Sequence, residues 1–325
     1  MADILVPLDG SRLAEQALPW AATVARATGG KIRLVEAIGL PMGEDFIGSL
    51  DELQAGASDY LNGQAEQVGR DYGLTASAIT SIGPAATIIL AEASSGGVGY
   101  IAMSTHARHG LRRAVLGSVA EHVLRESPVP VYLLPAAAQG RDLSAVKRIA
   151  IPLDGSALSQ SVLEPAAAFA QQLGATITLI RVYEPPEGAV FDEHGAMVRS
   201  ADQEVDRIAL LAEQYMAPLV RQLQRLGVEA NSTSELGHET ANEIVRQAEA
   251  AEADLIVMAT HGRSGLDRLR HGSVTEQVLR HSHIPLLAFG RIPLKSLVAV
   301  AAQVPARSVK AAETFSMPRV VQSVV

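Results

Sequence analysis

The chain has 325 residues, of which 48% are hydrophobic and only 4% aromatic, so it is long enough for two domains with cores built from Val, Ile, Leu and Ala. The net charge of −8 and the lack of a long basic stretch argue against DNA or RNA as a partner, because phosphate backbones are bound by clustered Lys and Arg. There is no cysteine, which excludes disulfides, thiolate metal sites and cysteine nucleophiles.

The first half alternates short apolar runs with longer segments of helical spacing. The first apolar run ends at Asp-Gly-Ser, where Ser11 can cap the helix that follows, and Gly29-Gly30 and Gly73 mark helix ends. The expected strands are residues 3–8, 31–38, 75–82, 100–104 and 130–134, and the expected helices are residues 13–28, 51–72, 85–94 and 118–126.

The second half repeats this order of elements. Its expected strands lie near Arg148, Thr176, Glu229, Leu255 and Pro285. Strands that alternate with helices predict right-handed crossovers and a parallel sheet with helices on both faces. We therefore expect an α/β fold of two tandem doubly wound five-stranded parallel-sheet domains, Rossmann-like, with strand order 3-2-1-4-5. Ligands bind such sheets beyond the carboxyl ends of the strands, where the strand order reverses.

Two sequence blocks occur twice and define the halves. Residues 4–11 reappear as 149–156 with six of eight positions identical, and residues 103–127 reappear as 258–282 with 15 of 25 identical. These blocks predict one domain over 1–138, a second over 146–292, and a C-terminal tail, 293–325, that is partly disordered. The second half holds about ten extra residues, which we place in the loop 184–200.

The chain also carries no signal of export or membrane insertion. It enters an apolar strand directly after Met1, without a basic region before a signal-like core. No segment approaches the roughly 20 apolar residues of a membrane helix. The expectation is a cytoplasmic protein with no membrane partner.

A Gly-Ser pair precedes the last helix of each half, Gly117-Ser118 and Gly272-Ser273. Glycine lets backbone amides approach an anion closely and adopt positive φ, and the amides and dipole of a helix start favour phosphate. The loops before the pairs read Ser104-Thr105-His106-Ala107-Arg108 and Ala259-Thr260-His261-Gly262-Arg263. The pattern favours a phosphate cradle, and because no Lys lies in it, it is not a Walker loop.

These residues resemble the universal stress protein family over both repeats, about nine-tenths of the chain. The ATP-binding signature of the family is Gly, two residues, Gly, nine residues, Gly, then Ser or Thr. The second half departs from it only at Ala259, whereas Ser104 and Ala107 replace both early glycines of the first half. Because the methyl group of Ala107 lies where backbone should approach phosphate, the second half is expected to be the better nucleotide site.

The resemblance implies a role for each matching position. The Asp after the first strand lies beside adenine, the Pro-Leu before it lines the pocket, and the residue near the end of the second strand offers backbone contacts to the base. The Met gives an apolar wall, and the Gly-Ser pair with the following Val holds phosphates. The cofactor-binding residues are then Pro7, Leu8, Asp9, Ala37, Met103, Ser104, His106, Ala107, Arg108, Gly117, Ser118 and Val119 in the first half, and Pro152, Leu153, Asp154, Val182, Met258, Ala259, His261, Gly262, Arg263, Gly272, Ser273 and Val274 in the second.

The resemblance further implies ATP, or ADP or AMP, as the ligand, with Mg²⁺ held through the phosphates and no dedicated protein metal ligand. The halves would form a pseudo-dimer with their last strands, near Val131 and Leu286, in contact, and two chains could pair further as a homodimer.

Simpler interpretations of the same residues remain open. Each Gly-Ser pair is followed by a Glu that completes a capping box, so it could be only a helix start. Asp9 and Asp154 could serve only as turn residues, and the two Met as core. His106 and His261 fit loop residues that form hydrogen bonds better than they fit catalytic groups or metal ligands.

Three functions compete. The first is an adenine-nucleotide-binding stress-response sensor or regulator without strong turnover, since no paired carboxylates or supported Ser-His-Asp set suggests catalysis. The second is a family member that acts through protein contacts alone, and the third is a slow ATPase. The fold by itself does not choose among them.

Overall fold

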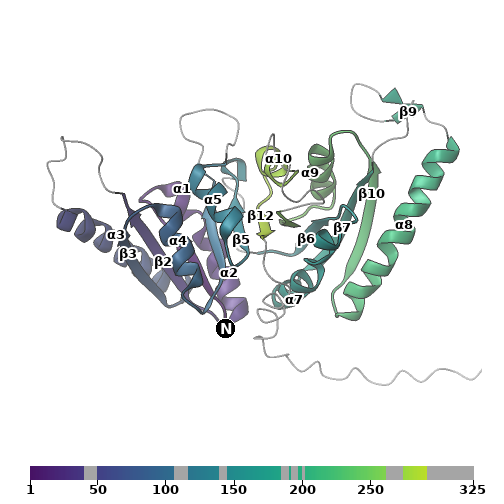
Figure 1. Cartoon of the computed structure of the whole chain (residues 1–325). Helices are drawn as coiled ribbons and strands as arrows, with labels where there is room; N and C mark the ends of the chain where they lie inside the picture. The colour runs from purple at the N-terminus through teal and green to yellow at the C-terminus, as the bar shows by residue number, and fades with distance from the viewer. Residues whose placement is uncertain are drawn as a thin grey trace, which may run out of the picture.

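The computed structural model of the chain describes residues 1–39, 50–105, 116–138, 145–183, 190–191, 197–199, 202–260 and 274–290. The expected tail, 293–325, lies outside these residues. Ten strands form one sheet that runs across both halves in the order β10-β7-β6-β11-β12-β5-β4-β1-β2-β3 (Figure 1). Five strands come from each half of the chain.

The first half has the predicted strand order, 3-2-1-4-5, with every pair inside it parallel. Its strands are β1 (Asp3–Pro7), β2 (Ile32–Ile38), β3 (Ala76–Ile82), β4 (Val98–Ser104) and β5 (Val131–Leu134). Its helices are α1 (Arg12–Glu15), α2 (Leu18–Thr28), α3 (Leu50–Tyr72), α4 (Ala85–Ser94) and α5 (Ser118–Glu126), followed by a 3-10 turn (Ala136–Ala138).

The second half repeats this order and adds a small hairpin. Its sheet strands are β6 (Arg148–Pro152), β7 (Thr176–Tyr183), β10 (Ala230–Leu236), β11 (Leu255–Ala259) and β12 (Leu286–Phe289). Its helices are α6 (Ala157–Gln160), α7 (Leu163–Leu173), α8 (Asp202–Arg225), α9 (Thr240–Ala250) and α10 (Val274–His281). The hairpin, β8 (Val190–Phe191) with β9 (Met197–Arg199), lies in the loop to which the extra residues were assigned.

Helices cover both faces of the sheet, as alternating strands and helices require. Buried side chains of α2, α3, α7 and α8 pack on one face, together with Ile4 and Ile149 of the two central strands. Buried side chains of α4, α5, α9 and α10 pack on the other face with Leu5 and Ala150. Successive residues of the inner strands β1 and β6 therefore alternate between two apolar layers, which explains why these two strands lack a polar face.

The predicted helix 13–28 is wrong as a single element, because the structure divides it into α1 and α2. Proline has no amide hydrogen, and its ring clashes with the carbonyl four residues earlier in a continuous helix. Pro19 would meet Glu15 in this way, and α1 ends at Glu15. The second half has the same break between α6 and α7, with Pro165 in the first turn of α7.

The two halves join through their last strands, as predicted for the pseudo-dimer. β5 and β12 pair antiparallel, with Leu133 opposite Leu286 and Tyr132 opposite Leu287. Over this seam the Trp20 ring of α2 stacks on Tyr132 at a centroid distance of 3.9 Å, and lies 6.3 Å from Phe169 of α7. Because one apolar cluster contains residues of both halves, they share a core rather than touching only at their surfaces.

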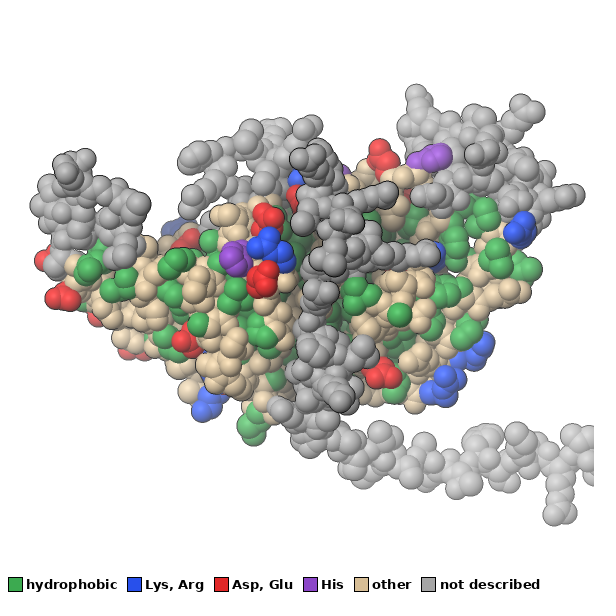
Figure 2. All heavy atoms as spheres, in the orientation of Figure 1, with side chains coloured by type: hydrophobic (Ala, Val, Ile, Leu, Met, Phe, Trp, Pro, Cys, Tyr) green, Lys and Arg blue, Asp and Glu red, His purple; other side chains and the backbone are tan. Residues whose placement is uncertain are grey.

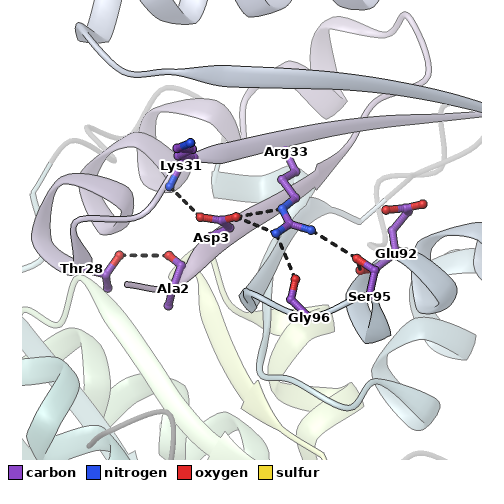
Figure 3. A network of polar contacts seen from close by, with 8 residues as sticks. All are labelled: Ala2, Asp3, Thr28, Lys31, Arg33, Glu92, Ser95 and Gly96. Atoms are coloured by element: carbon purple, nitrogen blue, oxygen red, sulfur yellow. Dashed lines mark hydrogen bonds and ion pairs between the residues drawn. The ribbon is translucent and has the colours of Figure 1, made fainter. Parts of the chain in front are cut away.

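A polar network ties the amino ends of the first-half strands together (Figure 3). Asp3 accepts hydrogen bonds from the Lys31 amide at 3.0 Å and from Arg33 Nε at 2.8 Å, and its ion pair with Arg33 Nη2 is 2.8 Å long. Arg33 also donates to Ser95 Oγ at 3.2 Å and to the Gly96 carbonyl at 3.0 Å. The network therefore links β1, β2 and the turn before β4.

We expect Asp3→Ala to lower the free energy of unfolding by about 1–3 kcal/mol, because it leaves the half-buried Arg33 guanidinium without its carboxylate. Urea unfolding measures this loss. The matched control is Glu66→Ala, which removes an exposed ion pair to Arg70 and should change stability by less than about 0.5 kcal/mol. Equal losses in the two variants would show that the network contributes no more than a surface pair.

Candidate functional site

The carboxyl ends of the first and fourth strands lie side by side in both halves, at the point where the strand order reverses. The chain leaves β1 toward Asp9 and leaves β4 just after Ser104. Asp154 and Ala259 hold the same places after β6 and at the end of β11. Each half thus brings its Asp-Gly-Ser turn and the start of its glycine motif to one edge of the sheet.

The Asp-Gly-Ser turn of the first half is closed by its own side chains. Asp9 Oδ1 accepts from the Ser11 amide at 3.1 Å and from the Ser11 hydroxyl at 2.6 Å. The Ser11 hydroxyl accepts from the Ala14 amide at 3.2 Å and caps α1, as predicted. The turn interpretation of Asp9 is therefore correct, and the exposed carboxylate also stands where a ligand at the switch point would lie.

The corresponding turn of the second half is held more firmly. Asp154 Oδ1 accepts from the Ser156 amide at 2.9 Å, and Arg181 Nη1 donates to the Leu153 carbonyl at 2.8 Å. Burial, the largest single influence, would raise the pKa of Asp154. Hydrogen bonds from Ser156 and Ser159 and the nearby Arg181 guanidinium together lower this pKa below its ordinary value. The carboxylate is therefore ionised at neutral pH.

The second strand runs past the end of the first in both halves. Pairing between β1 and β2 ends with the bond from the Leu8 amide to the Val35 carbonyl, at 2.9 Å. Ala37 lies two residues further on, so its amide and carbonyl point to the side of β2 that β1 has just left. Val182 has the same relation to the bond from Leu153 to Ile180, at 2.8 Å. These backbone groups face the strand exit, as the contacts to a base would require.

The apolar residues of the expected pocket divide between the two faces of the sheet. Met103, Met258, Val119 and Val182 pack in or against the cluster under α4, α5, α9 and α10. The side chains of Leu8 and Leu153 lie in the opposite cluster. The two Leu can therefore offer only backbone atoms to a pocket on the α5 and α10 face. Pro7 and Pro152, which precede the two Leu, are the last residues of β1 and β6.

The start of α5 differs from one expectation. Gly117 has φ −64° and ψ 151°, so its backbone is extended. Gly117 is itself the N-cap and has no side chain to cap the helix, so the capping box of Ser118 and Glu121 is wrong. The N-cap residue offers the first amides of α5 no side-chain acceptor, and uncapped amides at a helix start favour an anion.

The start of α10 lies against the exit of β11. The Thr275 hydroxyl donates to the Ala259 carbonyl at 3.4 Å, and Val274, the first residue of α10, is exposed. Eight predicted site residues lie outside the described part of the chain, and their roles stay predictions: His106, Ala107, Arg108, His261, Gly262, Arg263, Gly272 and Ser273.

Two charged residues beside the Asp turns have no place in the sequence motif. Arg181 holds the turn of the second half, and Glu36 occupies the same strand position in the first. Burial raises the pKa of Glu36, and the charge of Asp9 raises it further. Aligning the two repeats would have revealed the pair, because the strands align without a gap and the charge reverses.

The described residues give few further indications of a ligand or partner. Within the described ranges, no three His, Asp or Glu side chains gather as metal ligands. None of the described helices has the length and apolar character needed to cross a membrane. On the face drawn in Figure 2, the Lys and Arg side chains lie in small separate groups, several of them beside acidic ones.

Comparisons with known proteins match both halves. The family model described as "Universal stress protein family" matches residues 1–135 and 145–290. Universal stress protein Slr1230 of Synechocystis is 24% identical over 316 residues, which are 89% of this chain and 100% of that protein. Universal stress protein MJ0531 of Methanocaldococcus jannaschii is 34% identical over 149 residues, 43% of this chain and 80% of that protein.

A solved structure shows the same fold over nearly the whole chain. The crystal structure of a universal stress protein from Archaeoglobus fulgidus superposes with a TM-score of 0.65 and 24% identity. The match covers 89% of this chain and 98% of that one. The tandem arrangement is therefore shared with a protein of similar length.

Proposed function

The chain belongs to the universal stress protein family, and we propose that it binds an adenine nucleotide at the strand exits and acts as a sensor or regulator in the stress response. The proposed units are 1–138 and 146–292. The second unit is the principal site, because its motif keeps Gly262 where the first unit has Ala107.

One observation carries this proposal. In both halves the second strand extends beyond the end of the first strand, beside the Asp turn at the switch point. The backbone amide and carbonyl of Ala37 in the first half, and of Val182 in the second, lie on this extension. An adenine nucleotide needs a hydrogen-bond donor and acceptor at the edge of its base and an apolar side chain against the face of the base. It also needs an anion-binding site for its phosphates. Met258 and the start of α10 stand beside the same exit in the second half.

The phosphates would lie at the start of α10, where orphan amides and the helix dipole favour negative charge. Mg²⁺ would be held through those phosphates, since no three His, Asp or Glu side chains of the described residues gather into a metal site. Without an identified base or nucleophile at the site, binding and release of the nucleotide, rather than its turnover, would carry the signal.

Asp154→Asn should weaken MgATP binding about tenfold, because it removes the charge beside the base while leaving an oxygen for the Ser156 amide. Isothermal titration calorimetry of the full chain measures the dissociation constant. Asp9→Asn is the matched control in the first half and should change the affinity of the principal site by less than twofold. Unchanged binding in both variants would refute the assignment of the Asp turns.

A further inference from the structure

Three equivalent positions lie near the Asp turns, and two of them differ in charge between the halves. In the first half they are Glu15 of α1, Glu36 of β2 and Tyr60 of α3. The repeat offsets place Gln160, Arg181 and Tyr215 at the same positions of the second half. The tyrosine is kept, while two carboxylates are exchanged for an amide and a guanidinium.

In the second half these side chains form a cationic support for the turn. Arg181 lies over the rings of Tyr183 and Tyr215, with 4.9 Å and 5.7 Å from its guanidinium carbon to the ring centroids. Gln160 Nε2 donates to the Tyr215 hydroxyl at 3.1 Å. Held in this way, Arg181 Nη1 reaches the Leu153 carbonyl, the last backbone acceptor before Asp154.

In the first half the same frame is anionic. The Tyr60 hydroxyl donates to Glu15 Oε1 at 2.8 Å, and Gln64 donates to the same oxygen at 3.2 Å. Glu36 Oε2 is buried and has no hydrogen-bond partner among the residues that the structure describes. Glu36 also lies near the charge of Asp9, and the carboxylates of Asp9, Glu15 and Glu36 all act on the Tyr60 hydroxyl.

We infer that the second-strand position, Arg181 against Glu36, determines which half accepts the nucleotide. The inference rests on the proposed function. Arg181 is a positioning residue that fixes the Leu153–Asp154 backbone and balances the Asp154 charge. A polyanion such as MgATP can then enter the second half, whereas Glu15 and Glu36 of the first half repel it.

The test exchanges the charges in the full-length chain and follows MgATP binding by calorimetry. Wild-type chain should bind one MgATP. Gln160→Glu with Arg181→Glu should weaken that site at least tenfold, and Glu15→Gln with Glu36→Arg should add a second site. The matched control for the first-half exchange is Glu66→Arg with Glu126→Gln, which makes the same change of charge at exposed positions. It should leave the affinity for MgATP within about twofold and add no second site.

Single substitutions separate charge from packing. Arg181→Lys keeps the charge and should stay within about threefold of wild type, whereas Arg181→Gln should lose binding severalfold. The difference between these two variants should shrink as salt is raised, because screening weakens an electrostatic effect but not a packing defect. Thermal unfolding checks that each variant is folded. If the variant with Gln160→Glu and Arg181→Glu does not fold, Arg181→Lys and Arg181→Gln still test whether the charge at this position affects nucleotide affinity.

The outcomes distinguish this inference from the proposed function. Wild-type chain that binds no nucleotide refutes the proposed function, and this inference with it. Wild-type chain that binds, with the exchange in the second half leaving the dissociation constant unchanged, refutes the inference alone. A stoichiometry that stays at one after the exchange in the first half overturns the claim that Glu15 and Glu36 repel the ligand.

Discussion

Trp20→Ala should lower the free energy of unfolding by about 3–5 kcal/mol, the range measured for deleting large buried aromatic side chains. Trp20 is 1% exposed and stacks on Tyr132, whose strand forms the seam between the halves. Its ring also lies near Tyr100 and near Phe169 of the other half. Removing it therefore opens a cavity in the core that both halves share, and urea unfolding should show the loss.

The control for this variant is Trp20→Phe, which keeps an aromatic face on Tyr132 and should lose less than half as much stability. The shared cluster also predicts a single cooperative transition for the wild-type chain, since one continuous cluster of buried residues runs through both halves. Two well-separated transitions, with Trp20→Ala affecting only the first half, would contradict the account of a common core.

Gly30→Ala should also be strongly destabilising, by about 3 kcal/mol or more, because there is no space for a methyl group. A Cβ atom at this position would lie 1.9 Å from the Ala2 carbonyl oxygen and 2.6 Å from the Ala2 carbonyl carbon. Both atoms belong to backbone at the start of β1, which the Thr28 hydroxyl holds at 3.1 Å. The first two strands must then separate at their amino ends, which urea unfolding would report.

Gly63→Ala is the matched control, because it makes the same chemical change in the same half. Gly63 lies on the exposed side of α3, and a Cβ atom there would have no neighbour within 4 Å. Alanine should stabilise the helix by up to about 1 kcal/mol. If Gly30→Ala proved as stable as the wild type, the close approach of β2 to Ala2 would be wrong.

The position of the candidate site was predictable because polar residues repeat at the exits of the first and fourth strands, which are neighbours in the strand order 3-2-1-4-5. A core position gives no reason to repeat Asp9 and Asp154, so repetition of these residues locates the switch point. The contact between the last strands, near Val131 and Leu286, followed from the family resemblance, and the structure shows that these strands pair antiparallel. The sequence also contains the reason for the break between α1 and α2, since Pro19 cannot continue a helix that includes Glu15.

Other features depend on contacts that a sequence pattern does not contain. Strand alternation predicts which face of the sheet Glu36 and Arg181 occupy. It does not predict that tyrosines from distant helices lie near them. The Gly-Ser pair predicts a helix start, but the sequence fits either Ser118 or Gly117 as the N-cap. The structure shows that the N-cap is Gly117. Leu8 and Leu153 likewise sit next to the motif in sequence while their side chains point to the other face.

The measurement that tests the central claim most directly begins with freshly purified full-length chain, which is denatured so that any released small molecule can be identified. Nucleotide-free chain is then titrated with MgATP by calorimetry. The account predicts a released adenylate or saturable binding at one site per chain, lost in the variant with Gln160→Glu and Arg181→Glu. No released adenylate and no heat of binding would contradict it, and would favour a family member that acts through protein contacts alone.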